Sequence, residues 1–197
     1  MTTQMSELEL FIASPGDLPE ERAQISDIVD RVVQSCGVNL AVRIRVTKWE
    51  QVNPDLGRPQ DRINRLIDSC DIFVGLLHRR WGSDTGTHDS GFAEEWDRVL
   101  SRRASGPDPA VALFFKHLDA AEEADAGTQL TKVLEFRARI INEHVALYRE
   151  FSDADDLDRQ LTMYLVNLLT LRAAETNPSN SGSVSYTHLT LPTILRV

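Results

Sequence analysis

The sequence predicts an α/β protein built around one doubly wound, parallel, five-stranded sheet. Five short apolar segments recur along the chain and alternate with five amphipathic segments of helical periodicity. Two of the apolar segments are unbroken runs, which is typical of strands covered by helices on both faces. Strands that alternate with helices form parallel sheets joined by right-handed crossovers, so the pattern indicates this fold class.

The unbroken runs, residues 8–14 and 71–77, are expected at the centre of the sheet. Residues 39–49 alternate between apolar and polar side chains, which indicates an edge strand. Residues 110–115 and 145–151 supply the fourth and fifth strands. The predicted order is 2-1-3-4-5, which places a topological switch point, and a ligand crevice, between the first and third strands.

The helices are predicted from their apolar stripes and end signals. The first begins after Asp17, the expected N-cap, and Gly16 is expected to adopt a positive φ angle. A short helix carries Ile63, Leu66 and Ile67, and another follows Ser90. Further helices are expected around residues 130–141 and over 153–175, while the acidic residues 119–128 resemble a loop.

Composition excludes several classes of function. The 197 residues carry a net charge of -9, which argues against general nucleic-acid binding. No apolar run is long enough to cross a membrane, and no secretory signal is present, so we expect a cytoplasmic protein. Cys36 and Cys70 form no disulfide framework, and no histidine has zinc-type spacing with them, so no metal site is expected.

The chain divides into one domain and a tail. Residues 1–175 form the predicted α/β domain, and the Asn- and Ser-rich residues 176–183 form a linker. Residues 184–197 resemble the translation of a sequencing adapter, so we expect them not to be native and the natural protein to continue into further domains. A short native β segment is the alternative.

Several ordered motifs resemble a known family. They include Ser14-Pro15-Gly16-Asp17, Trp49-Glu50, Pro59-Gln60-Asp61-Arg62, Arg80-Trp81-Gly82-Ser83 and Ser90-Gly91-Phe92-Ala93-Glu94-Glu95. Together they resemble the TIR-like family of domains of unknown function numbered 4062, over residues 8–172. The resemblance implies a flavodoxin-like, TIR-related fold at the N-terminus of larger signalling or antiviral-defence proteins, ahead of NACHT- or STAND-type NTPase and repeat domains. The resemblance implies no established activity for the family itself, but relatives in the wider TIR group include enzymes that cleave NAD with a glutamate on the helix after the third strand.

Glu95 is the candidate catalytic residue, with Glu94 as the runner-up. If Phe92, Trp96 and Val99 mark the buried face of their helix, Glu94 points toward solvent and Glu95 lies on the flank, within reach of the crevice. A carboxylate there can bind a ribose diol or stabilise an oxocarbenium-like state. The alternative is that both acids simply favour the start of a helix.

Ser14, Gly16, Asp17 and Arg22 are candidate ligand-binding residues on the other side of the crevice. A hydroxyl and backbone N–H groups at a helix start can hold a phosphate, although the Asp17 charge opposes this. The alternative is a plain strand-to-helix turn that Asp17 caps, with Arg22 in an ion pair to Asp17 or Glu21.

Trp81, Gly82, Ser83 and Ser90 complete the candidate site from the loop after the third strand. The Trp81 ring either stacks on a nucleobase or nicotinamide, or covers the end of the sheet.

Two functions compete at this stage. The first is a signalling or effector domain that self-associates under the control of a downstream NTPase. The second is a glycohydrolase that uses Glu95 on NAD or another nucleotide as substrate. No cofactor is assigned.

Overall fold

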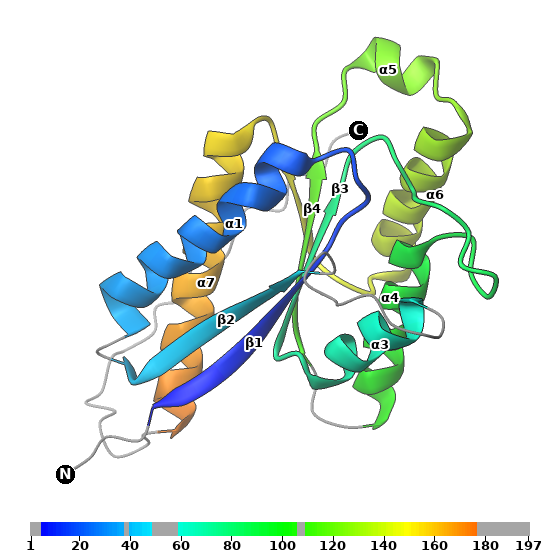
Figure 1. The fold of residues 1–197 in the computed structure, drawn as a ribbon. Coiled ribbons are helices and arrows are strands. Elements are labelled where there is room, and N and C mark those ends of the chain that lie inside the picture. The colour runs from blue at the N-terminus through cyan, green and yellow to red at the C-terminus, as the bar shows by residue number, and fades with distance from the viewer. Residues whose placement is uncertain (1–4, 38–39, 49–58, 106–108, 177–197) are drawn as a thin grey trace.

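The computed structural model describes residues 5–37, 40–48, 59–105 and 109–176, which form one parallel sheet covered by helices on both faces (Figure 1). The strands are β1 (Ser6–Ala13), β2 (Val42–Lys48), β3 (Ile72–Leu77), β4 (Ala110–Lys116) and β5 (Tyr148–Phe151). All neighbours pair in parallel, in the order β2-β1-β3-β4-β5, which confirms the predicted topology.

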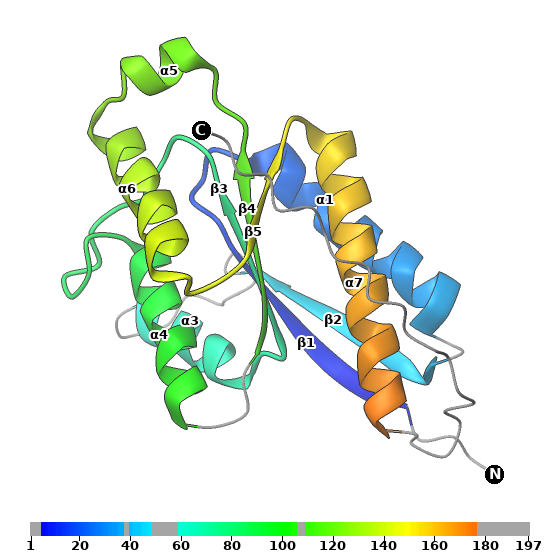
Figure 2. The same cartoon turned by 180° about the vertical axis from the view of Figure 1, so that it is seen from behind.

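The helices form two layers (Figures 1 and 2). One layer holds α1 (Pro19–Val32), which continues as a π-helical turn, η1 (Val33–Gly37), and α7 (Ala154–Thr176). The other layer holds α3 (Pro59–Ser69), α4 (Gly91–Ser105) and α6 (Thr128–Glu143). A short helix, α5 (Ala120–Ala124), lies beyond the carboxyl end of the sheet.

The alternation of side chains along the central strands divides the core in two. Leu10 and Ile12 of β1 pack in the half of the core that α7 closes with Leu157, Leu161 and Leu165. Their neighbours Phe11 and Ala13 point to the opposite half, beneath α3, α4 and α6. All six residues of β3 are buried, as expected for a strand covered on both faces.

The start of α1 differs from the prediction. Leu18, not Asp17, is the N-cap residue, and no side chain caps the helix; Pro19 follows it in the first turn. Gly16 does not adopt the expected positive φ, which among the described glycines occurs at Gly82 and Gly86. Asp17 does not cap α1 because its carboxylate turns toward the loop after β3, where it accepts two backbone hydrogen bonds.

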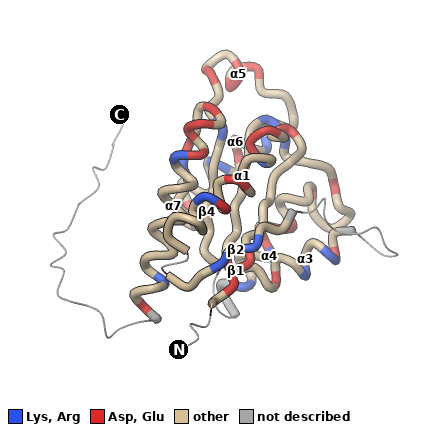
Figure 3. Tube along the Cα trace, turned by 60° about the vertical axis from the view of Figure 1, so that its left-hand side comes forward, with Lys and Arg blue, Asp and Glu red and all other residues tan. Residues whose placement is uncertain are grey.

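Residues 119–128 contain a helix where the sequence indicated a loop. Asp119 accepts a hydrogen bond from the backbone N–H of Glu122 (2.8 Å), and the Glu122 side chain accepts one from the N–H of Asp119 (2.9 Å). This reciprocal capping box stabilises a single helical turn. The acidic composition of the segment does not by itself indicate a helix. In the chain trace of Figure 3, red marks acidic positions along α5.

Two further predictions need correction or lie outside the described residues. The apolar pattern of residues 153–175 predicts that Leu171 faces the core, but it is 61% exposed, because the buried stripe of α7 runs through Leu161, Leu165 and Leu169 and leaves Leu171 on the opposite side. The Trp49-Glu50 motif and residues 177–197 of the predicted linker and tail fall outside the described residues. No helix in the described part of the chain is long and apolar enough to cross a membrane.

The absence of a side chain at Gly75 allows close packing at the centre of the sheet. A Cβ atom there would lie 2.6 Å from Leu113 Cδ2 and 3.3 Å from the Phe92 ring. We therefore expect Gly75→Val to lower the free energy of unfolding by about 1–3 kcal/mol, the usual cost of overpacking a core. Urea denaturation measures this, with Gly16→Ala, which meets nothing within 4 Å, as the control. Equal stability of the two variants would show that the interior is looser than described.

Candidate functional site

The candidate site lies where β1 and β3 end side by side. Asp17, in the loop after β1, ties this loop to the one after β3: its Oδ2 accepts hydrogen bonds from the backbone N–H groups of Arg79 (2.8 Å) and Arg80 (2.9 Å). The N–H groups of Arg79 and Arg80 lie beyond the end of β3 and therefore have no hydrogen-bond partner in the sheet. The Asp17 carboxylate supplies the acceptor for both. The predicted juxtaposition of the two loops is present, and Asp17 maintains it.

Glu95 lies in the interior beside this junction. Its side chain is only 6% exposed, and burial raises its pKa to about 8 from 4.5. The Gln60 amide and the charge of Arg22 oppose the rise, and the neighbouring charge of Glu94 adds to it. The carboxyl is therefore largely protonated near neutral pH, because desolvation disfavours its charged form more than these neighbours favour it.

Glu94 is also buried, which contradicts the prediction that it points into solvent. It is 6% exposed, and its oxygens accept hydrogen bonds from Asn64 Nδ2 (2.8 Å), Thr85 Oγ1 (2.7 Å) and Thr87 Oγ1 (2.9 Å). Its flank of α4 is covered because α3 packs beside it and the loop of residues 82–90 folds back over it. The sequence of α4 alone could not predict this burial, because a helical wheel includes neither α3 nor the loop.

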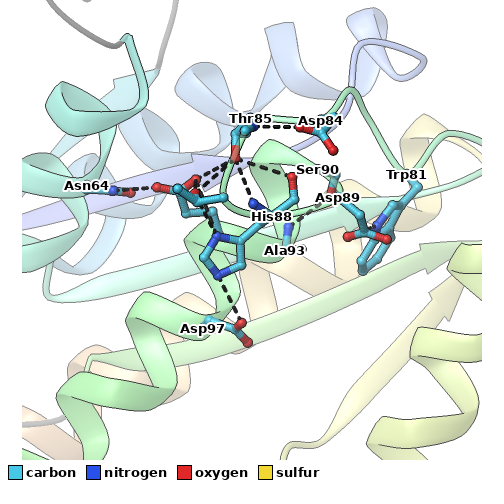
Figure 4. Close-up of polar contacts among 12 residues, drawn as sticks. Asn64, Trp81, Asp84, Thr85, His88, Asp89, Ser90, Ala93 and Asp97 are labelled. Atoms are coloured by element: carbon cyan, nitrogen blue, oxygen red, sulfur yellow. Dashed lines mark hydrogen bonds and ion pairs between the residues drawn. The ribbon is translucent and has the colours of Figure 1, made fainter.

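His88 fastens the same loop to α4. Its Nδ1 lies 3.0 Å from Thr87 Oγ1 and 3.5 Å from Glu94 Oε2, and its Nε2 lies 3.3 Å from Asp97 Oδ2. Figure 4 shows the contacts that connect Asn64, Thr85, His88 and Asp97. Thr85, Thr87 and His88 thus hold the loop against α4 through Glu94 and Asp97.

The helix α3 contributes two residues that the sequence analysis did not select. Gln60 and Asn64 lie four residues apart and reach Glu95 and Glu94, respectively. Gln60 is 8% exposed, yet its Nε2 makes no hydrogen bond of normal length and angle among the described residues. A sequence signal was available: both residues fall on the same stripe of α3 as Ile63 and Ile67, where a polar side chain is unusual. We name Arg22, Gln60, Asn64, Glu94 and Glu95 the Glu95 cluster.

The other residues predicted on the β1 side have local roles. Ser14 is 8% exposed, and its hydroxyl donates to the Pro15 carbonyl at 3.0 Å. Arg22 is buried in the Glu95 cluster, while Glu21 pairs with Lys116 at the end of β4 (2.6 Å). Gly16 is exposed in the loop between Ser14 and Asp17.

Trp81 packs into an aromatic cluster under α4 and α6. It is 4% exposed, and its ring centroid lies 5.6 Å from that of Phe92 and 5.3 Å from that of Phe136. The indole N–H donates to Asp89 Oδ1 at 2.9 Å. The ring therefore covers the end of the sheet and offers no free face for stacking on a base.

The remaining predicted residues shape the loop. Gly82 has a φ of 112°, and its N–H, like that of Trp81, donates to Gln129 Oε1. Ser90 is completely buried and caps α4 by accepting a hydrogen bond from the N–H of Ala93 (3.0 Å). Ser83 is exposed. Within the described residues, no group of three or more His, Cys, Asp or Glu side chains is arranged to hold a metal ion.

Comparison with known proteins identifies the family. The model of the family described as "Domain of unknown function (DUF4062)" matches residues 9–166, and the chain belongs to that family. This confirms the family resemblance seen in the motifs. No curated protein matches the chain significantly.

Solved structures show distant similarity. General stress protein 14 from Treponema denticola, in complex with FMN, is 17% identical, with 82% of this chain and 99% of that chain covered and a TM-score of 0.35. An NAD(P)H:quinone oxidoreductase from Methanothermobacter marburgensis is 10% identical over 84% and 98% of the two chains, with a TM-score of 0.38. An NADPH-quinone reductase from P. pentosaceus is 12% identical over 84% and 97%, with a TM-score of 0.35. Similarities this distant carry no argument about a ligand of this chain.

The pKa of Glu95 predicts how stability depends on pH. Because burial raises the pKa in the folded state to about 8 from 4.5, the folded protein binds more protons than the unfolded chain between these values. The stabilisation is therefore fully present below the lower value and is lost as pH rises through the upper one. We expect Glu95→Gln, which cannot ionise, to gain stability relative to the wild type over this range, by an amount on the order of a few kcal/mol.

Urea unfolding of both proteins at a series of pH values measures this difference. Glu20→Gln, which removes an exposed carboxylate from the first turn of α1, is the matched control and should follow the wild-type curve. A constant difference between Glu95→Gln and the wild type at every pH would contradict the assigned environment.

Proposed function

We propose that this DUF4062 domain is a TIR-like signalling or effector domain of a larger signalling or antiviral-defence protein, and that it acts by self-association. Its partners are other copies of the same domain, brought together by NTPase or repeat domains that follow it in the natural protein. The family membership and the parallel sheet support the first part of the proposal. The enclosed state of Glu95 favours association over catalysis.

The burial of Glu95 is the observation that carries the choice between the two functions. A carboxyl group that assists glycosidic cleavage, as an acid or as a nucleophile, must lie beside the scissile bond of the substrate. Glu95 is only 6% exposed, so in this structure its carboxyl group is closed to a substrate. Arg22 and Gln60 lie beside it in the interior.

Exposed apolar side chains at one corner of the sheet support self-association. Leu147 is 93% exposed immediately before β5, and Ile141 is 46% exposed near the end of α6. β5 is the last strand of the sheet, and edge strands beside exposed apolar residues are frequent sites of protein association.

The second candidate is an NAD or nucleotide glycohydrolase that uses Glu95. A strongly raised pKa at the switch point of an α/β sheet is typical of catalytic acids, and this observation favours the alternative. It requires a rearrangement that exposes Glu95 to a substrate, which association of several copies can supply.

We expect the domain to self-associate when its concentration is raised, since exposed apolar area drives association. Light scattering coupled to gel filtration measures this. Leu147→Glu should weaken association at least about tenfold, because it places a charge where apolar area would be buried. Met163→Glu, at a 58% exposed site on α7, is the matched control. A strictly monomeric wild type would refute the proposal.

A separate assay distinguishes the enzyme. The domain, fused to an oligomer-forming partner, is incubated with NAD, and the release of nicotinamide is followed beside Glu95→Ala. The signalling proposal predicts no release from either protein. Release that Glu95→Ala abolishes would establish the glycohydrolase instead.

A further inference from the structure

The loop of residues 82–89, which we call the flap, is held firmly at both ends. Trp81, just before it, is packed in the aromatic cluster, and Ser90, just after it, is completely buried. The Trp81 indole donates to Asp89 Oδ1, and Lys132 of α6 pairs with the same carboxylate, each at 2.9 Å. The two ends of the flap therefore lie close together, as in an Ω-loop, a compact surface segment that is frequently functional.

Hydrogen bonds within the flap make it a compact unit. The N–H of Thr85 donates to the His88 carbonyl (3.0 Å), and the N–H of His88 donates to Thr85 Oγ1 (3.2 Å). The N–H of Gly86 donates to Asp84 Oδ1 at 2.6 Å, and its φ of 87° allows the chain to reverse there. The flap can therefore move as one body without losing its own hydrogen bonds.

Only polar contacts hold the described middle of the flap against α4. Every residue of the flap is polar or glycine and at least partly exposed. The hydroxyls of Thr85 and Thr87 both donate to Glu94 Oε2, at 2.7 and 2.9 Å. His88 lies between the carboxylates of Glu94 (3.5 Å) and Asp97 (3.3 Å). Segments without buried apolar contacts are those that open locally at low free energy, so closure of the flap depends on these carboxylates.

We propose that the flap is a lid that opens as a unit between its two anchors and exposes the carboxylate of Glu94. Figure 4 shows Thr85 and His88 turned toward the helices that carry Asn64 and Asp97. When the flap opens, Asn64 of α3 still donates to Glu94 Oε1 (2.8 Å), while Oε2 becomes accessible at the first turn of α4.

The open flap breaks the enclosure of the Glu95 cluster at one point, because Glu94 belongs to that cluster. The lid operates whichever of the two proposed functions the domain performs. For the glycohydrolase, it supplies the first step of the rearrangement that access to Glu95 requires.

Chemical labelling of carboxyl groups in the full chain tests the proposal. A carbodiimide and glycine ethyl ester couple to accessible carboxyl groups, and mass spectrometry gives the labelling rate of Glu94 relative to exposed Glu20. We expect the double variant Thr85→Val, Thr87→Val to raise this rate at least about tenfold, because a buried carboxylate loses two donors and gains more from water. Ser83→Ala, which removes an exposed flap hydroxyl outside these contacts, is the matched control and should label as the wild type does.

The urea dependence of labelling in the wild type is a second measurement that needs no variant. Opening of a lid exposes little surface, so the rate at Glu94 should hardly change below the unfolding transition, whereas labelling through global unfolding rises steeply with urea. The proposal is overturned if the rate rises as steeply as unfolding does, or if Glu94 in the wild type reacts as fast as Glu20. An unchanged rate at Glu94 in the folded double variant also overturns it.

Discussion

The structure depends on the side-by-side pairing of β1 and β3 at the centre of the sheet. All of β3 and the second half of β1, from Leu10 to Ala13, are apolar and buried because helices cover both faces of the sheet there. Since parallel strands end at the same edge, the two following loops are brought together, and the Asp17 carboxylate locks them through two backbone N–H groups. The Glu95 cluster joins α3 and α4 to Arg22 of α1.

The cluster shows why a carboxylate at a switch point does not by itself define an active site. Glu94 has three hydrogen-bond donors from α3 and the loop of residues 82–90, whereas Glu95 is enclosed beside Arg22 and Gln60. Two adjacent buried acids are tolerated because one is well supplied with donors and the other retains its proton. In this state the cluster holds α3 and α4 together, and any chemistry at Glu95 requires it to open.

The sequence was sufficient for the fold, but not for the directions of the side chains in the candidate site. Unbroken and alternating apolar runs identify central and edge strands, so the order of the sheet followed from local patterns. The burial of Glu94 did not follow, because it depends on α3 and on a loop distant in the sequence. Asp17 looked like a helix cap for the same reason: its true partners, the Arg79 and Arg80 N–H groups, come close only in the folded sheet. Gln60 and Asn64 could have been found, since polar residues on an apolar stripe are a signal of an interior polar contact.

The protonation state of Glu95 tests the account most directly. A carbon NMR titration of its side-chain carboxyl in the intact domain follows this group alone, with Glu95→Gln to assign the resonance. The account predicts a midpoint near pH 8, because burial outweighs the influence of Arg22 and Gln60. A midpoint near the ordinary value of 4.5 would show a solvated carboxylate that a substrate can reach, and would contradict the enclosure of Glu95 on which the choice of association over catalysis rests.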